Sequence, residues 1–190
     1  MEKWKEFVER LSEPLLKINF RRGEHEEIRP DKGFEEWCEQ TLDLREKRGV
    51  IYLIGNGASA SMASHFSADL AKNARLHTQV FSDLSLLTAI SNDMGYENVF
   101  SEPLRRRASP GDMLVAISSS GRSKNILAAV ELAKSLDMKI VTLSGMSPDN
   151  PLRLLGTLNV YVSGKTYGII ETCHAAILHH WMDLVAENNE

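Results

Sequence analysis

Short runs of apolar, often β-branched residues alternate with helical patterns from residue 49 onward. These runs lie near residues 49–54, 78–81, 112–117, 139–143 and 158–162. Each is almost continuously apolar, which is typical of a strand that is buried on both faces. Helical patterns fall between most of the runs. The sequence therefore predicts an α/β fold, a doubly wound and mainly parallel five-stranded sheet with helices on both sides.

The first 48 residues show a different pattern, which predicts two helices separated by a polar break from Arg21 to Gly33. Apolar residues recur at helical spacing on more than one side of this pair. Exposed apolar stripes tend to mark interfaces, so we expect the pair to contact another subunit as well as its own domain. The prediction is a single domain over residues 1–190, with residues 1–48 for packing and oligomerisation and residues 49–190 as the α/β core.

Composition narrows the possible functions. The chain has 190 residues, of which 43% are hydrophobic and 25% charged, so it can bury the core of one compact domain. Its formal net charge of -4 argues against sequence-independent nucleic-acid binding, which depends on an excess of Lys and Arg. The basic run Arg105 to Arg107 is interpreted as a solvated helix face rather than an anion site.

Features of targeting and redox chemistry favour a cytoplasmic protein. The charged start, Met1 to Glu6, lacks the apolar core of a signal peptide, and no apolar run approaches the roughly 18 residues that a membrane span needs. Cys38 and Cys173 lie in helical patterns without CxxC spacing, so we expect reduced thiols.

Two turns rich in serine and glycine carry the clearest chemical signal. Gly55 to Ser61 follows the strand that ends at Ile54, and Ser118 to Ser123 follows the strand that ends at Ile117. Glycine lets backbone amides approach a ligand, serine hydroxyls add donors, and the next helix turns its positive N-terminus towards the bound group. Ligands of such sheets lie beyond the carboxyl ends of the strands. The turns therefore predict a phosphorylated small molecule.

A dinucleotide site is the alternative, because the residues from Gly55 to Ala60 match the loose pattern G-x-G-x-x-A. Such a site needs an acidic residue about 20 positions further on, to hold the ribose. Asp69 comes too early and within a helix, and Asp83 lies 26 residues after Gly57. The run Ser118 to Ser123 offers four hydroxyls, of which helix N-capping explains one. We therefore favour a monophosphate.

Ionisable side chains gather on two predicted helices. His65 and Asp69 are four residues apart on the helix after the first turn, so they share one face. Further candidates occupy the last helix: Glu171, His174, His179 and His180. A lone helical histidine is usually structural, whereas several near a phosphate cradle point to catalysis.

Separated motifs follow one another along nearly the whole chain: Gly55-Asn56-Gly57 with Ser59, His65-Phe66, Asn92-Asp93, Ile117 to Ser123, and Glu171 with His174 and His179. In this order they resemble the phosphoheptose isomerases of the sugar isomerase (SIS) domain group. The resemblance implies that sedoheptulose 7-phosphate and a manno-heptose 7-phosphate are interconverted through an enediol. It also implies a homotetramer with active sites shared between subunits.

The resemblance also assigns roles to individual residues. Asp69 would remove the proton from the carbon beside the carbonyl, and His179 would shuttle protons among the oxygens. The phosphate would be held by four serines, Ser118, Ser119, Ser120 and Ser123. The sugar would be contacted by Asn56, Asn92 and Asp93, and the other substrate-binding positions are Gly57, Ala58, Ser59 and Glu171.

A zinc ion is a further implication, with His65, Asp69, Glu171 and His179 at the ligand positions. Imidazole and carboxylate suit that metal. Residues eight apart on one helix are separated by about 12 Å of rise, so Glu171 and His179 meet one ion only if Glu171 precedes the helix or reaches inward.

Two positions depart from the family, which usually has Glu where this chain has Asp69 and Gln where it has Glu171. These changes suggest a divergent isomerase acting on a related sugar phosphate. Some SIS proteins of this length are instead adaptors without catalysis, including one that binds the replication initiator DnaA, and others sense sugar phosphates. Because the carboxylate at 69 and the histidine at 179 are present, the sequence favours an enzyme.

Overall fold

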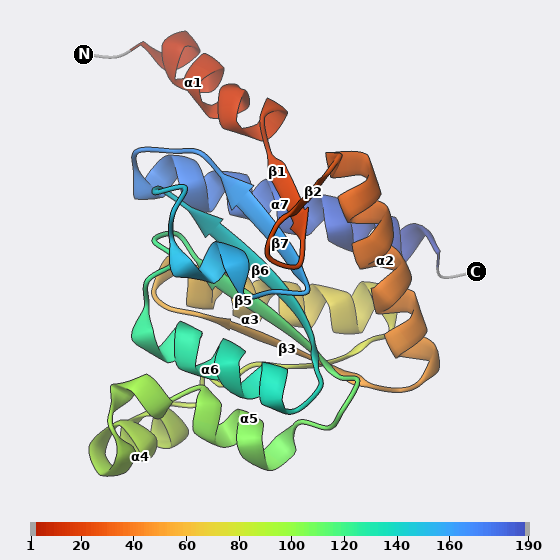
Figure 1. The fold of residues 1–190 in the computed structure, drawn as a ribbon, viewed down its shortest axis with the longest axis vertical. Helices are drawn as coiled ribbons and strands as arrows, with labels where there is room; N and C mark the ends of the chain where they lie inside the picture. The colour runs from red at the N-terminus through yellow and green to blue at the C-terminus, as the bar shows by residue number, and fades with distance from the viewer. Residues whose placement is uncertain (1–2, 189–190) are drawn as a thin grey trace.

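A seven-stranded sheet forms the middle layer of the computed structural model, which describes residues 3–188 (Figure 1). The strand order is β2-β1-β7-β6-β5-β3-β4. Strands β3 to β7 are parallel, and β1 pairs antiparallel with both β2 and β7. The strand bounds are β1 Asn19–Arg22, β2 Glu26–Ile28, β3 Val50–Gly55, β4 His77–Gln79, β5 Met113–Ser118, β6 Lys139–Gly145 and β7 Leu158–Val162.

Helices cover both faces of this sheet. Helices α2, α3 and α7 pack on one face, and α4, α5 and α6 on the other (Figure 1). The doubly wound, mainly parallel α/β fold is thus confirmed. No helix within residues 3–188 is long and apolar enough to cross a membrane. The helix bounds are α1 Trp4–Leu16, α2 Pro30–Glu46, α3 Ala58–Ala74, α4 Leu84–Met94, α5 Ser101–Arg107, α6 Lys124–Ser135 and α7 Tyr167–Glu187.

The two turns predicted to bind an anion lie at the topological switch point of the sheet. Along the parallel part the order is β4-β3-β5-β6-β7, so the chain first moves outward from β3 to β4 and then returns to the other side of β3. Gly55 at the end of β3 pairs with Ile117 at the end of β5. In doubly wound sheets ligands bind at this reversal, beyond the carboxyl ends of the strands.

Strand β5 shows why the apolar runs were recognisable. All six of its residues are buried. Met113, Val115 and Ile117 contribute to the core under α2, α3 and α7, whereas Leu114 and Ala116 contribute to the core under α4, α5 and α6. Burial on both faces replaces the usual apolar and polar alternation with a continuous apolar run.

The sheet has two strands more than the sequence predicted. All five predicted strands are present, but the expected polar break contains most of the hairpin β1–β2. The two strands pair antiparallel, and Phe20 is buried. Their other side chains form cross-strand ion pairs between Arg21 and Glu27, 2.8 Å apart, and between Arg22 and Glu26. Its charged strands lack an apolar run, and β1 forms by adding to the edge of β7.

The two N-terminal helices differ in how they pack. Helix α2 is joined to α7 by the stacked rings of Trp37 and Trp181, whose centroids are 4.2 Å apart. Helix α1 extends from the body of the protein (Figure 1), and its Trp4 and Leu16 side chains are 76% and 84% exposed. An apolar face of α1 is therefore open to solvent in the single chain.

Candidate functional site

The first turn joins β3 to α3 through two glycines. Gly57 has a φ of +56°, in the region that favours glycine. A Cβ atom on Gly55 would lie 2.5 Å from the backbone carbon of Ser59, which is too close for any side chain. The glycines therefore allow α3 to begin at Ala58, directly beyond the end of the strand.

The second turn joins β5 to α6 and is supported by the loop that follows β6. Gly121 has a φ of +62°, and a Cβ atom there would lie 1.9 Å from Oδ1 of Asn150. The Asn150 side chain is fully buried, and its Nδ2 donates to the carbonyl of Ser147 at 2.8 Å. The backbone amide of Leu152 donates to the carbonyl of Gly121 at 3.2 Å. These contacts fix the shape of the turn.

The serine hydroxyls of this turn are not used for capping α6. Ser123 is the N-cap residue of that helix, yet its side chain makes no capping hydrogen bond, and its Oγ lies 3.4 Å from Oγ of Ser118. Oγ of Ser120 accepts from the backbone amide of Arg122 at 3.3 Å, which leaves its O–H as a donor. Oγ of Ser119 is buried and has no hydrogen-bond partner within the described chain. Buried hydroxyls normally have partners, so the Ser119 hydroxyl is a donor that remains available to a ligand.

The four serines of the predicted phosphate site thus share one turn but differ in their surroundings. Ser118 and Ser119 are buried, whereas Ser120 is half-buried and its hydrogen bond holds the turn itself. The Ser119 and Ser120 hydroxyls both keep a free O–H donor, but the Ser120 oxygen already accepts a hydrogen bond within the turn, whereas the Ser119 hydroxyl has no partner in the described chain.

Cationic side chains border the serines. Arg122 forms an ion pair with Asp149, with Nη2 and Oδ1 3.1 Å apart. Hydrogen bonding from Ser147 and the charge of Arg122 hold the pKa of Asp149 below its usual value. Lys124, at the start of α6, is also exposed. The first-turn amides of that helix add positive partial charge, so the turn suits an anion.

The predicted catalytic residues lie together where α3 packs against α7. Nε2 of His65 is 3.3 Å from Oδ2 of Asp69. The ring of His179 lies 5.6 Å from the His65 ring and 4.7 Å from the ring of Phe66, edge to face in both cases. The fold thus brings a carboxylate and two imidazoles into one cluster, which we call the α3–α7 cluster.

Glu171 lies apart from this cluster. It is in the second turn of α7, near the carboxyl end of β6, because His174 one turn later contacts the carbonyl of Ser144 at 3.2 Å. Asp69 is eleven residues beyond Ala58, which corresponds to about 16 Å along the axis of α3. The candidate residues therefore form two groups, one at the turns and one at the α3–α7 cluster.

The expected zinc site does not form within one chain. His65, Asp69 and His179 are neighbours, but Glu171 precedes His179 on the same helix by about 12 Å of rise. Over residues 3–188, no group of three or more His, Cys, Asp and Glu side chains is arranged to hold a metal ion. Within a single chain these four donors therefore do not meet at one zinc ion.

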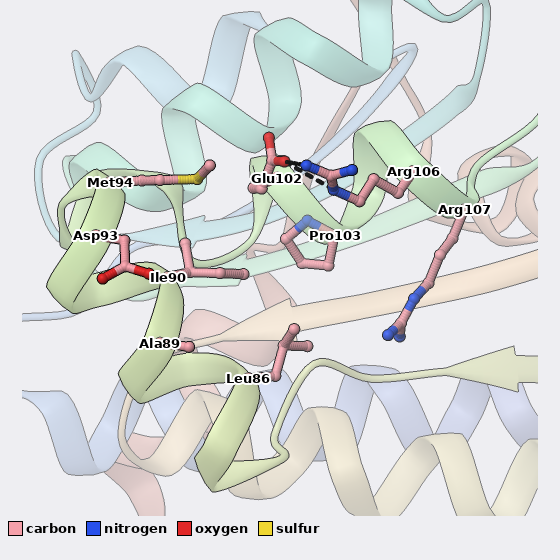
Figure 2. A pocket seen from close by; sticks show the side chains of 9 residues that line it. All are labelled: Leu86, Ala89, Ile90, Asp93, Met94, Glu102, Pro103, Arg106 and Arg107. Carbon is pink, nitrogen blue, oxygen red and sulfur yellow. Dashed lines mark hydrogen bonds and ion pairs between the residues drawn. The ribbon is translucent and has the colours of Figure 1, made fainter.

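Asn92 and Asp93, predicted to contact sugar hydroxyls, lie near the end of α4. Figure 2 shows Asp93 lining a pocket of about 180 Å³ between α4 and α5. Nδ2 of Asn92 donates to Oδ1 of Asp93 at 2.8 Å. In the same pocket Nε of Arg106 donates to Glu102 at 2.8 Å (Figure 2). Arg105, Arg106 and Arg107 are all exposed, which supports the interpretation of the basic run as a solvated face of α5.

The sequence did not single out two residues that hold Asn56. Nδ2 and Oδ1 of Asn56 each pair with the side chain of Asn125, at 2.9 Å in both directions. The Tyr96 hydroxyl donates to Oδ1 of Asn56 at 3.0 Å. Asn125 carries only a weak signal in the sequence, as a polar residue directly before the buried Ile126 in the first turn of α6. Asp83, the acidic candidate of the dinucleotide alternative, instead caps α4 by accepting from the amide of Leu86.

The other histidines of the last helix have structural surroundings. His174 is fully buried, and its Nε2 donates to the carbonyl of Ser144. Burial lowers the pKa of His174 to about 4, so the ring is neutral at pH 7. The ring of His180 packs edge to face on Phe34 at 4.6 Å. Of the α7 histidines, His179 is the one in the α3–α7 cluster.

Comparison with known proteins shows the family to which the chain belongs. The SIS domain family matches residues 31–145. A phosphoheptose isomerase of Helicobacter pylori is 35% identical over 164 residues, which cover 81% of this chain and 85% of that protein. One from Coxiella burnetii is 37% identical over 143 residues, covering 71% and 72%. The solved structure of phosphoheptose isomerase from Neisseria gonorrhoeae has a TM-score of 0.75 at 32% identity, covering 81% of this chain and 86% of that one. The chain therefore belongs to the SIS domain family, as a relative of its phosphoheptose isomerases.

Proposed function

We propose that this protein is an aldose–ketose isomerase that converts sedoheptulose 7-phosphate to D-glycero-D-manno-heptose 7-phosphate through an enediol. The relatives named phosphoheptose isomerase match most of the chain at 35% and 37% identity. The two turns at the switch point of the sheet supply a place for the phosphorylated end of such a sugar.

The buried hydroxyl of Ser119 is the observation that carries the phosphate assignment. This Oγ has no partner in the described chain, and the hydroxyls of Ser118 and Ser123 lie beside one another in the same turn. A phosphate has several strong acceptor oxygens and can take hydrogen bonds from all of them. A bound phosphate would therefore satisfy a donor that is otherwise desolvated without compensation.

The α3–α7 cluster supplies the proton chemistry. An aldose–ketose isomerisation removes a proton from the carbon beside the carbonyl, returns it to the neighbouring carbon and moves a second proton between the oxygens. Asp69 is the base for carbon, oriented by its contact with His65, and His179 carries the proton between oxygens. Positioned acids and bases of this kind each contribute about 10² to 10⁴ in rate.

The separation of the two groups supports a homotetramer with shared active sites. Asp69 lies about 16 Å along α3 from the first turn of the same chain, which is farther than the phosphate and the reacting carbon of one heptose phosphate lie from each other. We therefore infer that the cluster of one subunit serves the turns of another. The exposed apolar residues of α1, Trp4 and Leu16, offer surface for that contact.

Zinc and a cytoplasmic location stay predictions from the sequence. Glu171 of the same chain lies too far along α7 to reach the α3–α7 cluster. The predicted zinc site would therefore need Glu171 from a second subunit. The alternative function, an adaptor or sensor, requires neither Asp69 nor His179 to act on substrate. Their meeting in one cluster therefore favours the enzyme.

Turnover of sedoheptulose 7-phosphate by the purified protein tests the proposal. We expect activity in the wild type and a loss of about 10²-fold or more in Asp69→Asn, which removes the base and keeps the shape of the side chain. Asp137→Asn is the matched control, since Asp137 is exposed and has a positive φ that asparagine tolerates.

The same assay, run with and without a chelator and with analysis of bound metal, decides the zinc prediction. No turnover of any heptulose, hexose or pentose phosphate would contradict the isomerase. An adaptor would instead keep its partner binding in Asp69→Asn.

A further inference from the structure

The carboxamide of Asn56 is held by two residues that lie outside the predicted sugar contacts. Asn125 is 3% exposed and pairs with Asn56 through two reciprocal hydrogen bonds of 2.9 Å. The Tyr96 hydroxyl donates to Oδ1 of Asn56 at 3.0 Å. Asn56 thus has three side-chain hydrogen bonds before any ligand binds, and its conformation is set by the protein.

The backbone of α6 decides which way this pair of amides faces. The amide N–H of Ile126 donates to Oδ1 of Asn125 at 3.0 Å. Because a backbone N–H is only a donor, the Asn125 oxygen must face it, and Nδ2 of Asn125 is then the group that meets the Asn56 oxygen. Both lone pairs of Oδ1 of Asn56 are used, by Asn125 and Tyr96. The group that remains is one N–H of Asn56.

The pair also connects the two turns. Asn56 follows β3, and Asn125 is the second residue of α6, two positions after Ser123. A displacement of Asn125 would therefore move the first turn relative to the serines. Tyr96 is 56% exposed, and together with Asn56 and Gly57 it lines a pocket of about 210 Å³ beside the first turn.

We propose that Asn125 and Tyr96 are positioning residues, which hold Asn56 so that it presents a single N–H donor to an oxygen of the phosphosugar. This inference rests on the proposed function, because it takes the phosphosugar as the ligand of the turns. Asn56 selects an acceptor oxygen on the sugar, and the serines bind the phosphate independently of it. A substitution that disturbs Asn56 should therefore weaken binding of the sugar while the affinity for inorganic phosphate stays the same.

The variant Tyr96→Phe separates positioning of the sugar by Asn56 from binding of the phosphate by the serines. The ring is half exposed, so the variant keeps its packing and loses the hydrogen bond to Asn56. We expect KM for sedoheptulose 7-phosphate to rise about fivefold, the usual effect of losing one hydrogen bond. We expect kcat and the Kd of inorganic phosphate, measured by calorimetry, to stay within about twofold, because the lost contact acts on substrate and transition state alike.

Asn125→Asp is the second variant. The carboxylate keeps both acceptor positions, towards Ile126 and Nδ2 of Asn56, but cannot donate to the Asn56 oxygen. We expect a larger rise in KM than in Tyr96→Phe. Tyr52→Phe is the matched control, because it also loses one phenolic hydrogen bond, to the carbonyl of Arg107, and should leave KM unchanged.

The outcomes separate this inference from the proposed function. An unchanged KM in both variants would overturn the positioning role. A loss of phosphate affinity in Tyr96→Phe equal to its rise in KM would also overturn it; this criterion is not applied to Asn125→Asp, whose new charge by itself repels phosphate. The Kd of sedoheptulose 7-phosphate is measured in parallel and should rise as KM does. A wild type that binds this sugar phosphate without converting it contradicts the isomerase, while the variants still decide the positioning role by Kd. A wild type that binds neither phosphate nor sugar phosphate overturns both.

Discussion

The imidazole of His65 contacts the carboxylate of Asp69 one helical turn later on α3, with Nε2 and Oδ2 3.3 Å apart. The contact orients the carboxylate, and the ring of His179, on α7, lies 5.6 Å from the His65 ring. Asp69 is shorter by one methylene than the glutamate usual in the family. Asp69 still lies with His65 and His179 in one cluster, where we propose that it acts as the base and His179 as the proton carrier.

Replacement of His179 by phenylalanine tests the proton carrier. The ring of His179→Phe can keep the edge-to-face packing on Phe66, seen at 4.7 Å, but it carries no proton. We expect kcat to fall by about 10² to 10⁴ with the fold retained. Steady-state kinetics and circular dichroism check both points. His180→Phe is the control, because His180 packs on Phe34 instead. An equal fall of kcat in both variants would contradict the role of His179 as proton carrier.

Ser119→Ala should have opposite effects on binding and stability. The variant removes a donor that a phosphate would use, so the Kd of inorganic phosphate should rise about fivefold. The same hydroxyl is buried without a partner, so its removal should not lower the free energy of unfolding. Calorimetry and urea unfolding measure the two effects. Ser135→Ala, at the far end of α6 from the turn, is the control and should leave phosphate binding unchanged. A phosphate Kd in Ser119→Ala equal to that of the wild type would contradict the cradle.

His174 makes stability depend on pH. Burial lowers its pKa from 6.5 to about 4 in the folded protein, whereas the unfolded chain keeps the ordinary value. As pH falls from 6.5 towards 4, the unfolded state takes up a proton that the folded state excludes, so stability falls by the order of 3 kcal/mol over that window. His174→Gln removes the titrating group. Urea unfolding at pH 7 and at pH 4.5 should give a smaller difference for the variant, and an equal difference would refute the assignment.

Substitutions on α1 test the proposed subunit contact. Leu16 is 84% exposed in the single chain, so Leu16→Lys should leave the domain folded and disrupt packing between subunits. We expect analytical ultracentrifugation to show species smaller than the proposed tetramer, with lower specific activity because the proposed active sites use residues of two subunits. Glu9→Lys, on an exposed polar position of α1, is the control. A fully tetrameric Leu16→Lys protein would exclude this part of α1 from the interface.

Local patterns were enough to predict the parallel strands and the two turns. A strand such as Met113–Ser118 is buried on both faces, so its apolar run is continuous and visible without knowledge of its neighbours. The glycines at 57 and 121 adopt positive φ values that follow from the local chain path, and they mark both turns in the sequence. The ionisable candidates were likewise found from helical spacing.

Tertiary contacts decided the hairpin β1–β2, the grouping of the candidate site residues and the partners of Asn56. The hairpin β1–β2 has charged strands and forms by pairing with the edge of β7, far away in the sequence. Helical spacing placed Glu171 and His179 on one helix, but only the packing of α3 on α7 showed that His179 joins Asp69 and that Glu171 does not. The hydrogen bonds between Asn56 and Asn125 join residues 69 positions apart. Such contacts depend on how strands and helices are ordered in space, and a single sequence carries no local pattern for that order.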